Sequence, residues 1–552
     1  MVHNATVRIL LALLAVSVAS AVPLGSAALA RSSKPQRPNI VVLETDDQTV
    51  ESLRVMPNVQ RLLAARGVTF DSSFVSFSLC CPSRATFLTG QYAHNHGVFG
   101  NSPPQGGYYK LDGSNTLPVS LQAAGYATVH LGKYLNGYGT RDATEVPAGW
   151  SEWHGSVDQS TYRYYGVTLN EGGKLTTYDS EYTTDVYSRK AAEIVRRRAA
   201  SAQPFFLWVA FLAPHAGGPT GPGHPQGTPL PAPRHQGRFA AEPLPTPPSF
   251  DEQDVSDKPS FVRSRSLLRS GGTAVIAQRY RLRLESLLAV DEAVAQIVQA
   301  LAASGELDDT VIVFTSDNGF MHGEHRIPNG KVVVYEPSVR VPLILRGPGI
   351  PAGTHLSQPV SNIDLAPTFA ALAGAKLLRK VDGRSLLPLF RDRGLHWGRD
   401  LLEEAGGNAG FEAIRTPRYL YAEYGNGERE LYDLVRDRDE LVSRHEDPAY
   451  AAVRLELARR LAVLQRCAGD SCRNGPSVAL SVRCASTTLQ ATLSGADQRL
   501  VTYVDFLVDG RRVARDRSAP FSRAVAGKYV RASAYLVDGR LVTRDRAAPR
   551  CR

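Results

Sequence analysis

Short apolar runs alternate with amphipathic stretches along the first two thirds of the chain. Runs at residues 39–43, 205–211 and 310–315 are rich in β-branched and aromatic residues, as strands buried on both faces are. Between them, patterns such as Leu282–Leu301 repeat with the period of a helix. Strands that alternate with helices predict an α/β fold with a largely parallel sheet covered on both faces. Sites in such sheets lie at the carboxyl ends of the strands, so the polar residues that follow each run are the first candidates.

The pattern changes twice toward the carboxyl end. Residues 217–248 are crowded with Pro, Gly and His, which predicts a long loop at the rim of a site. A smaller unit, expected over residues 374–466, leads into a different region at 467–552. There Asp509-Gly510 and Asp538-Gly539 each stand between alternating apolar residues, which is a hairpin-turn signal. This last region is expected to form a β-sandwich similar to bacterial immunoglobulin-like modules, with a spacer role favoured over carbohydrate adhesion.

The amino terminus predicts export. Arg8 precedes an apolar run over residues 9–22, and Ala28-Leu29-Ala30 supplies small residues for cleavage after Ala30. The run is short for a membrane span, and no later segment is expected to be long and apolar enough to be one. With no cysteine near the cleavage site, a lipid anchor is not expected. Residues 1–30 are therefore predicted to be a signal peptide of a secreted protein without a membrane span.

Charge and cysteines narrow the picture. The chain has 63 Lys and Arg against 53 Asp and Glu, a formal charge of +10. A cationic surface concentrates anions, which suits an enzyme of anionic polymers, although arginines scattered on a solvated surface explain the charge equally. Four of the six cysteines lie in the last quarter, where an exported protein can form disulfides. Cys467 with Cys472 would close a short loop and Cys484 with Cys551 would close the terminal module, but spacing alone leaves the connectivity open.

The most specific motif lies at residues 80–90, Cys-Cys-Pro-Ser-Arg-Ala-Thr-Phe-Leu-Thr-Gly. Pro82 suits the first turn of a helix, where its missing N–H costs nothing, so Cys80 is expected at the helix N-terminus. That position favours negative charge and a bound sulfate oxygen. A structural cysteine, or a vicinal disulfide between Cys80 and Cys81, is the alternative. The pattern C-x-P-S-R-x-x-x-L-T-G resembles the signature of the type I sulfatases, and in that family the first cysteine, here Cys80, is oxidised to Cα-formylglycine.

Oxygen ligands follow two of the predicted strands. Asp46-Asp47 comes after the first apolar run and Asp317-Asn318 after the last. Hard divalent cations require such clustered oxygens, whereas either pair alone could be a turn or a helix cap. The resemblance implies that Asp46, Asp47, Asp317 and Asn318 bind one calcium ion per chain, with an oxygen of the modified Cys80 completing the site.

The resemblance also assigns the cations of the site. Arg84 would brace the modified cysteine, and Lys133 of the Gly132-Lys133 pair would contact it or the sulfate. His215, which follows the second apolar run, and Lys331 would meet the ester oxygen of the leaving group. Fixed positive charge of this kind stabilises the charge that develops on a sulfate group.

One position departs from the commoner family pattern. Many sulfatases carry G-K-x-H, but Leu135 stands where that histidine would be, which leaves the general base open. The Gly-Lys-Tyr-Leu-Asn-Gly-Tyr-Gly sequence around it is instead similar to the glucosamine-6-sulfatase branch. His94 and His96 follow the helix that starts at Cys80, and a helix of about nine residues spans about 14 Å, too far for either to reach the nucleophile. His325 is the better candidate on the substrate side.

The resemblance covers about residues 38–448. It implies an alkaline-phosphatase-like α/β fold, with a catalytic domain at 38–373, a small C-terminal α+β subdomain at 374–466 and the added β module beyond. It implies a calcium- and formylglycine-dependent sulfuric ester hydrolase that acts on 6-O-sulfated N-acetylglucosamine or a related sulfated glycan. A formylglycine-generating enzyme would be a partner in maturation, and no nucleic-acid partner is expected. A general arylsulfatase acting on aryl sulfates, a phosphate or phosphonate monoester hydrolase, and a non-catalytic sulfoglycan-binding protein are the alternatives.

Overall fold

The computed structural model describes residues 37–219, 221, 224–395, 397–406, 410–473, 478–495, 498, 501–536 and 541–551. The predicted signal peptide, residues 1–30, and the predicted turn at Asp538-Gly539 lie outside the described residues. Both stay predictions.

Four parallel strands form the centre of the main sheet. In spatial order they are β9 (Thr310–Ser316), β1 (Asn39–Thr45), β8 (Phe205–Ala210) and β4 (Ala127–Gly132). Every residue of these strands is buried. The three apolar runs of the sequence are therefore strands, as predicted, and they are neighbours in the sheet.

Further strands extend the sheet on both sides. They are β2 (Val68–Phe70), β5 (Glu152–Ser156), β6 (Tyr165–Glu171), β7 (Lys174–Tyr182), β10 (Leu343–Arg346) and β11 (Thr354–Leu356). Among the described residues the sheet has ten strands in the order β11-β2-β10-β9-β1-β8-β4-β5-β6-β7. The sheet is mixed, because β10 runs antiparallel to both neighbours and β6 runs antiparallel to β5 and β7. Beside it, β3 (Ser73–Phe74) pairs with β12 (Val360–Ser361).

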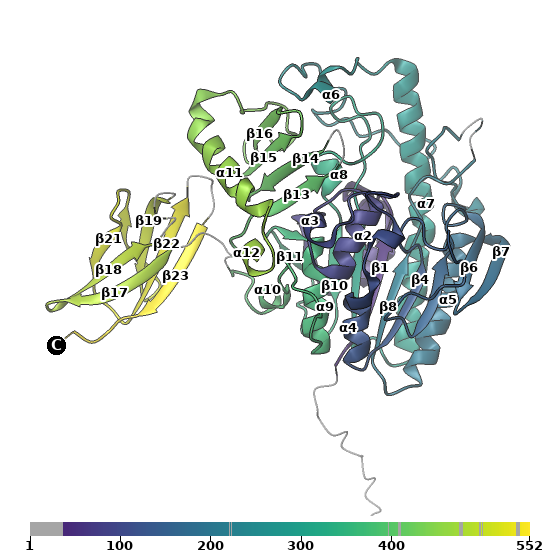
Figure 1. Ribbon diagram of the computed structural model, residues 1–552, viewed down its shortest axis with the longest axis horizontal. Helices are drawn as coiled ribbons and strands as arrows, with labels where there is room; N and C mark the ends of the chain where they lie inside the picture. Colours follow the sequence, from purple (N-terminus) through teal and green to yellow (C-terminus); the bar gives the residue numbers. More distant parts are fainter. Residues whose placement is uncertain are drawn as a thin grey trace, which may run out of the picture. The chain divides into compact units, whose positions relative to one another are not determined.

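Helices cover both faces of this sheet (Figure 1). One face, which includes Val41 and Leu43, packs against α1 (Pro57–Leu62), α5 (Thr183–Ala199) and α7 (Ser270–Ala303). The other face, with Ile40 and Val42, packs against α2 (Cys80–Thr89), α4 (Leu117–Ala123), α9 (Leu365–Ala373) and α10 (Leu387–Arg391). Successive side chains of a strand point to opposite faces, so a sheet covered twice requires strands that are apolar at every position. Short helices are α3 (Ala93–His96), α6 (Ser260–Arg263) and α8 (Glu336–Val339).

Helix α7 corrects one expectation. The sequence pattern predicts no segment after the amino terminus that is long and apolar enough to span a membrane, yet α7 meets that test by length and composition. In the structure 61% of its most apolar window is buried, and Leu284 and Val294 lie in the core against the sheet. A helix that covers a wide sheet is apolar around much of its circumference, so it is similar to a membrane span in composition.

The small C-terminal unit is an antiparallel sheet followed by a helix. Its strands lie in the order β13 (Leu401–Ala405), β14 (Phe411–Arg415), β15 (Tyr419–Tyr424) and β16 (Arg429–Asp433), and α11 (Ala451–Leu464) follows. A Cys467–Cys472 disulfide lies in one apolar cluster with Leu457 and Leu461 of α11. This disulfide therefore packs with the small unit, and α12 (Asp470–Arg473) ends that segment of the chain.

The terminal module is a β-sandwich with an apolar core of its own. One sheet is β17 (Ala479–Ala485), β18 (Thr488–Ser494) and β21 (Ser522–Val525). The other has the order β20 (Arg511–Asp516), β19 (Val501–Val508), β22 (Tyr529–Leu536) and β23 (Leu541–Ala547). Asp509 and Gly510 turn between β19 and β20 with φ of 48° and 83°, as a two-residue hairpin turn requires. A Cys484–Cys551 disulfide closes the module.

Candidate active site

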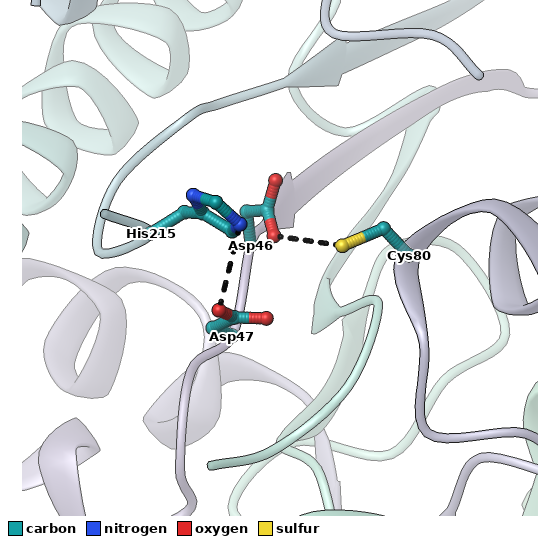
Figure 2. Close-up of side chains that lie close together, drawn as sticks. All are labelled: Asp46, Asp47, Cys80 and His215. Atoms are coloured by element: carbon teal, nitrogen blue, oxygen red, sulfur yellow. Dashed lines mark hydrogen bonds and ion pairs between the residues drawn. The ribbon is translucent and has the colours of Figure 1, made fainter. Parts of the chain in front are cut away.

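The carboxyl ends of the four central strands bring the predicted site residues together. In the register of the sheet, Thr45 of β1 lies beside Ser316 of β9, and Gly132 of β4 lies beside Ala210 of β8. The chain leaves these strand ends through Asp46-Asp47, Asp317-Asn318, Lys133 and the segment that reaches His215. Figure 2 shows Asp46, Asp47 and His215 on one side of Cys80, with Asp46 nearest to it. The structure thus brings these segments together at one edge of the sheet.

Cys80 opens helix α2 and faces this edge. Its Sγ lies 3.6 Å from Asp46 Oδ1 and 2.9 Å from Lys331 Nζ. Both Cys80 and Cys81 are free, so a vicinal disulfide is excluded. Burial, with the charge of Asp46, raises the pKa of the Cys80 thiol to about 12. An unmodified Cys80 would therefore be a neutral thiol at pH 7, and a neutral thiol is a poor nucleophile.

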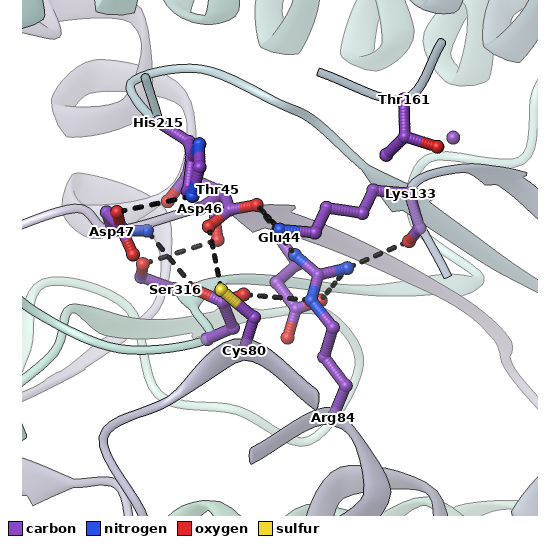
Figure 3. A network of polar contacts seen from close by, with 12 residues as sticks. Glu44, Thr45, Asp46, Asp47, Cys80, Arg84, Lys133, Thr161, His215 and Ser316 are labelled. Atoms are coloured by element: carbon purple, nitrogen blue, oxygen red, sulfur yellow. Dashed lines mark hydrogen bonds and ion pairs between the residues drawn. The ribbon is translucent and has the colours of Figure 1, made fainter. Parts of the chain in front are cut away.

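Arg84 holds the site together from one helical turn further along α2 (Figure 3). Its side chain is completely buried. Its Nε donates to Asp317 Oδ2 at 2.8 Å, and a terminal nitrogen donates to the Lys133 carbonyl oxygen at 2.8 Å. The same guanidinium lies 3.3 Å from Glu44 Oε2 at the end of β1. Arg84 thus connects β1, the loop after β9 and the loop after β4, which are the elements that carry the acidic residues and Lys133.

The charges at the strand ends are almost balanced. Lys133 pairs with Asp46 and Lys331 pairs with Asp47. Burial opposes ionisation of Asp46, but Lys133, His215 and Arg84 outweigh burial and hold the pKa of Asp46 below its ordinary value. Burial and the negative charge of Asp46 instead raise the pKa of Asp317. Four acidic side chains, Glu44 included, thus lie among the cations Lys133, Lys331, Arg84 and, behind Asp47, Arg283. Burial also raises the pKa of Glu44 to about 7, so not every acid carries a full charge at neutral pH.

The residues present fit a hard metal ion. Asp46, Asp47 and Asp317 are buried carboxylates, and the Asn318 amide oxygen has no hydrogen-bond partner among the described residues. Carboxylate and amide oxygens are the ligands that calcium prefers. The ligand atoms of Asp46, Asp47, Cys80 and His215 lie within 4.8 Å of one another, and Asp317 and Asn318 are not members of that group. Because calcium selects oxygen over imidazole nitrogen, His215 is better placed as a group that faces the substrate.

His215 presents one nitrogen to the site. Its Nδ1 lies 2.6 Å from the Ala216 carbonyl oxygen, which assigns the proton to Nδ1. Its Nε2 lies 3.8 Å from Asp47 Oδ2, which is too far for a hydrogen bond. Burial lowers the pKa of His215, so the ring is neutral near pH 7.

Tyr162 is a site residue that the sequence analysis missed. Its ring lies 5.1 Å from the His215 ring, and Lys133 Nζ lies 4.8 Å from its centroid. Asn136 donates to its hydroxyl at 2.5 Å. The ring of Tyr162 therefore lies between Lys133 and His215, and Asn136 holds its hydroxyl. Nothing in the sequence around Tyr162 marks it, because it reaches the site from the connection between β5 and β6.

Arg283 is a second missed residue, on helix α7. It is 3% exposed, and its guanidinium donates to the Asp47 carbonyl oxygen and, at 3.1 Å, to the Pro214 carbonyl oxygen. It also stacks 4.1 Å above the ring of Phe320. One cation thus contacts the loops that follow β1, β8 and β9. An arginine within the apolar Leu282–Leu301 pattern was the signal that could have found it.

Three histidines weighed from the sequence are not at the site. His325 is 1% exposed, bonds Glu252 at 2.7 Å and packs on Tyr335. A side chain without free surface cannot contact a substrate, so the substrate-side assignment of His325 is corrected to a structural one. His94 contacts Glu404, and His96 contacts Thr86, which agrees with the expectation that neither reaches the nucleophile.

Comparison with known proteins shows which family carries this arrangement of residues. The family profile described as Sulfatase matches residues 38–375, more than half of the chain. The chain belongs to the sulfatase family. A second profile, described as N-sulphoglucosamine sulphohydrolase, C-terminal, matches residues 323–467 of this sulfatase. The resemblance seen in the Cys80 motif is thereby confirmed, and with it the class of sulfuric ester hydrolases.

The relatives of this sulfatase include arylsulfatases, N-acetylglucosamine-6-sulfatases and extracellular sulfatases. It is 34% identical over 511 residues to an arylsulfatase of Volvox carteri, and this alignment covers 82% of this chain and 78% of the Volvox protein. It is 32% identical over 492 residues to the N-acetylglucosamine-6-sulfatase of Homo sapiens, and this alignment covers 79% of this chain and 86% of the human protein. Among solved structures, a protein in complex with its substrate D-glucosamine-2-N,6-O-disulfate matches with a TM-score of 0.68 and 27% identity, over 78% of this chain and 98% of that one. The alkaline-phosphatase-like fold is confirmed.

Proposed function

We propose that this sulfatase is a secreted, calcium-dependent enzyme that hydrolyses sulfate monoesters of 6-O-sulfated N-acetylglucosamine or a related sulfated glycan. One observation carries the proposal. Cys80 Sγ lies 2.9 Å from Lys331 Nζ and 3.6 Å from Asp46, at a strand-end cluster of buried carboxylates and buried cations. A sulfate group needs positive charge on its oxygens and a nucleophile at its sulfur, and both converge here.

Cys80 is the proposed nucleophile, after oxidation to Cα-formylglycine by a formylglycine-generating enzyme. The motif that includes Pro82 and Arg84 is intact, and Cys80 is the first residue of its helix. The modified residue would supply a hydrated carbon with two hydroxyls, one for attack on sulfur and one for later release of sulfate. Serine has only one hydroxyl, so it could perform the first of these tasks alone.

Asp46, Asp47, Asp317 and Asn318 are the proposed calcium ligands. A bound calcium ion would supply Lewis-acid chemistry that lowers the pKa of a hydroxyl on residue 80. Arg84 keeps this set in place through its bonds to Asp317 and to the Lys133 carbonyl. Positioning of this kind supplies much of the rate, because no group has to move when the charge develops.

Lys133, Lys331 and His215 are the proposed contacts to the substrate. The two ammonium groups pair with Asp46 and with Asp47, and together they can share the negative charge of a sulfate. The departing sugar oxygen needs a proton or a hydrogen bond, and Lys331 is the charged donor nearest to Sγ. His215, with its proton on Nδ1, offers Nε2 as a hydrogen-bond acceptor for a sugar hydroxyl.

The choice of sugar rests on two likenesses. The human relative is named N-acetylglucosamine-6-sulfatase, and the solved structure with the TM-score of 0.68 holds a 6-O-sulfated glucosamine. The arylsulfatase of Volvox carteri is equally similar in sequence, so an aryl sulfate is the natural competitor.

A panel of defined esters tests the proposal. kcat/KM would be measured on N-acetylglucosamine 6-sulfate, glucosamine 2-N,6-O-disulfate, an aryl sulfate and the phosphate analogue of each, with the Cys80→Ala protein as the blank. We expect a 6-O-sulfated glucosamine to give the highest value and each sulfate to exceed its phosphate analogue. A phosphate ester that turns over faster than its sulfate would overturn the assignment, and the aryl sulfate as best substrate would overturn the choice of sugar.

A further inference from the structure

The positive charge of this chain is concentrated in one part of it. Residues 478–552 hold 14 Lys and Arg against 6 Asp and Glu, a net of +8. Residues 37–477 hold 46 Lys and Arg against 47 Asp and Glu. The catalytic part is therefore nearly neutral. The charge that could attract an anionic polymer lies almost entirely in the terminal β-sandwich.

Within the sandwich, arginines gather along one border. Strand β20 is the edge of its sheet, β21 is the edge of the other, and the two lie beside each other. We call this border the β20 edge and define it by its five arginines, Arg511, Arg512, Arg515, Arg517 and Arg523. The side chains of Arg512, Arg515 and Arg523 are 58%, 33% and 47% exposed. The β20 edge is therefore a row of accessible guanidinium groups.

Two buried carboxylates hold part of this row in position. Asp505 accepts from Arg515 at 2.7 Å and lies 3.6 Å from Arg512. Asp516 accepts from Arg523 at 3.1 Å. The carboxylates are 7% and 4% exposed, so they lie beneath the arginines while the guanidinium groups keep free surface. Arg511 and Arg517 have no ion-pair partner among the described residues. Three of the five cations thus share two acidic partners, and guanidinium groups held in this way are pre-organised to bind sulfates in pairs of hydrogen bonds.

A flat aromatic surface adjoins the row. Tyr503 of β19 and Tyr535 of β22 stack across the sheet with centroids 4.3 Å apart, and both are partly exposed. Arg515 lies 4.3 Å above the Tyr503 ring. Exposed tyrosine rings offer an apolar face with a polar tip, which suits the face of a sugar ring whose substituents are charged.

Protection of a sheet edge is the simpler explanation for charges on β20, because charged edges prevent pairing with another chain. It accounts for charge of either sign on the strand. It does not account for the surplus of 14 basic over 6 acidic residues in the module, next to a balanced catalytic part.

We propose that the β20 edge binds sulfated polysaccharide and thereby attaches the enzyme to the polymer that carries its substrate. The choice of polymer rests on the proposed function, because a sulfatase meets polysaccharides with many sulfates. The inference replaces the spacer role that the sequence alone favours.

The test is a binding measurement on the full-length chain. Immobilised heparin is the probe, with neutral dextran and double-stranded DNA as comparisons, and the protein carries Cys80→Ala so that no turnover occurs. The edge variant is Arg511→Ser with Arg512→Ser and Arg517→Ser. The matched control removes three exposed arginines of the catalytic part, Arg391→Ser with Arg393→Ser and Arg436→Ser.

We expect heparin binding that weakens steeply with salt, because exposed charges are screened. The edge variant should lose about tenfold in affinity, since three exposed ion pairs with the polymer, each of them weak, are removed together. The control should stay within about twofold of the parent. Turnover of a small sulfate ester should be unchanged when the edge substitutions are placed in the active enzyme.

Equal losses in the edge variant and the control would overturn the proposal, as would binding to dextran. DNA that binds as tightly as heparin would also overturn it, since the surface would then recognise charge alone. A chain that binds heparin through the β20 edge but hydrolyses no sulfate ester would refute the proposed function and leave this inference standing.

Discussion

The active site and the β20 edge of the terminal module each contain an Arg–Asp ion pair, and the two pairs differ in how far the arginine is exposed to solvent. Arg84 bonds Asp317 at 2.8 Å with neither side chain exposed, whereas Arg515 bonds Asp505 at 2.7 Å with 33% of the arginine side chain exposed. Removing one partner of a buried pair leaves an uncompensated charge, at a cost of about 3–5 kcal/mol. At the β20 edge only Asp505 is buried and the arginine keeps contact with solvent, so the pair contributes less, toward the value of about 0–1 kcal/mol for a fully exposed pair. The comparison teaches that burial, and not the number of charges, decides how much each residue matters.

The largest effect is expected inside the site. Asp46→Asn should lower kcat/KM on a small sulfate ester by at least about a hundredfold, because Lys133 and Arg84 would lose the charge that they face. Calcium binding, measured by calorimetry, should weaken with it. The control is Asp71→Asn, an aspartate 45% exposed that pairs with His355. Equal activity in the two variants would show that the carboxylates at the strand ends are not the metal site.

A smaller loss is expected one layer behind the site, at Arg283. Arg283→Met should lower kcat by about tenfold to a hundredfold with little change in KM, because a misplaced loop slows the chemistry more than it weakens binding. Burial lowers the pKa of Arg283 to about 10, so the guanidinium is charged at neutral pH.

Methylguanidine should restore part of the lost turnover at Arg283, which a merely unstable variant would not show. Arg281→Met is the matched control, on the same helix and bonded to the Glu242 carbonyl oxygen. A higher KM with unchanged kcat would contradict the role of Arg283 as a positioning residue. So would the absence of rescue by methylguanidine in a variant that is correctly folded.

Burial should also matter for folding stability, and Glu403 is the buried acid that tests this. It contacts Arg415, which also meets Glu336 and Glu440, so three carboxyl groups face one guanidinium. Burial raises the pKa of Glu403 to about 7, above its ordinary value of 4.5. The stabilisation from the neutral acid is therefore complete below pH 4.5 and is lost as the pH rises through about 7.

Glu403→Gln keeps an acceptor for Arg415. Its free energy of unfolding should match that of the parent near pH 5 and exceed it at pH 8 by up to about 3 kcal/mol. Thermal unfolding at both pH values measures this, with the half-exposed Glu423→Gln as the control. The same difference in Tm at both pH values would contradict the raised pKa.

The smallest effect is expected from removal of the terminal module. A chain that ends after Arg473 keeps the Cys467–Cys472 disulfide that packs with α11, and it loses none of the proposed site residues. Its kcat on a small soluble sulfate ester should equal that of the parent within about twofold, the usual range for changes away from a site. A folded truncate with lower turnover on the small ester would show that the module contributes to the active site.

Residues of the site that sit at strand ends could be predicted from the sequence, and those that arrive from elsewhere could not. Asp46, Asp317 and His215 each follow an apolar run that predicts a buried strand, so a parallel sheet must bring them to one edge. Lys133 follows β4, which the sequence analysis did not predict as a strand, and only the family resemblance pointed to it. Tyr162 and Arg283 reach the same place from a loop and from the middle of a helix. Their positions depend on tertiary packing, which local periodicity does not encode.

His325 shows the opposite error. It lies seven residues after Asn318, in a loop that carries Lys331, and proximity in sequence favoured a role at the substrate. The loop turns its side chain into the core against Tyr335 and Glu252. The fold class was predictable because buried strands and covering helices leave a periodic pattern over many residues. The direction of a single side chain in a loop leaves none.

The central claim is that residue 80 is the nucleophile as formylglycine, and mass spectrometry of its peptide tests this most directly. Protein would be purified from its native host, and the turnover of the same sample would be measured. The account predicts a peptide about 18 Da lighter than the cysteine form, or nearly unchanged if hydrated, in a fraction that accounts for the active enzyme. Full turnover in protein whose Cys80 is entirely an unmodified thiol would contradict it.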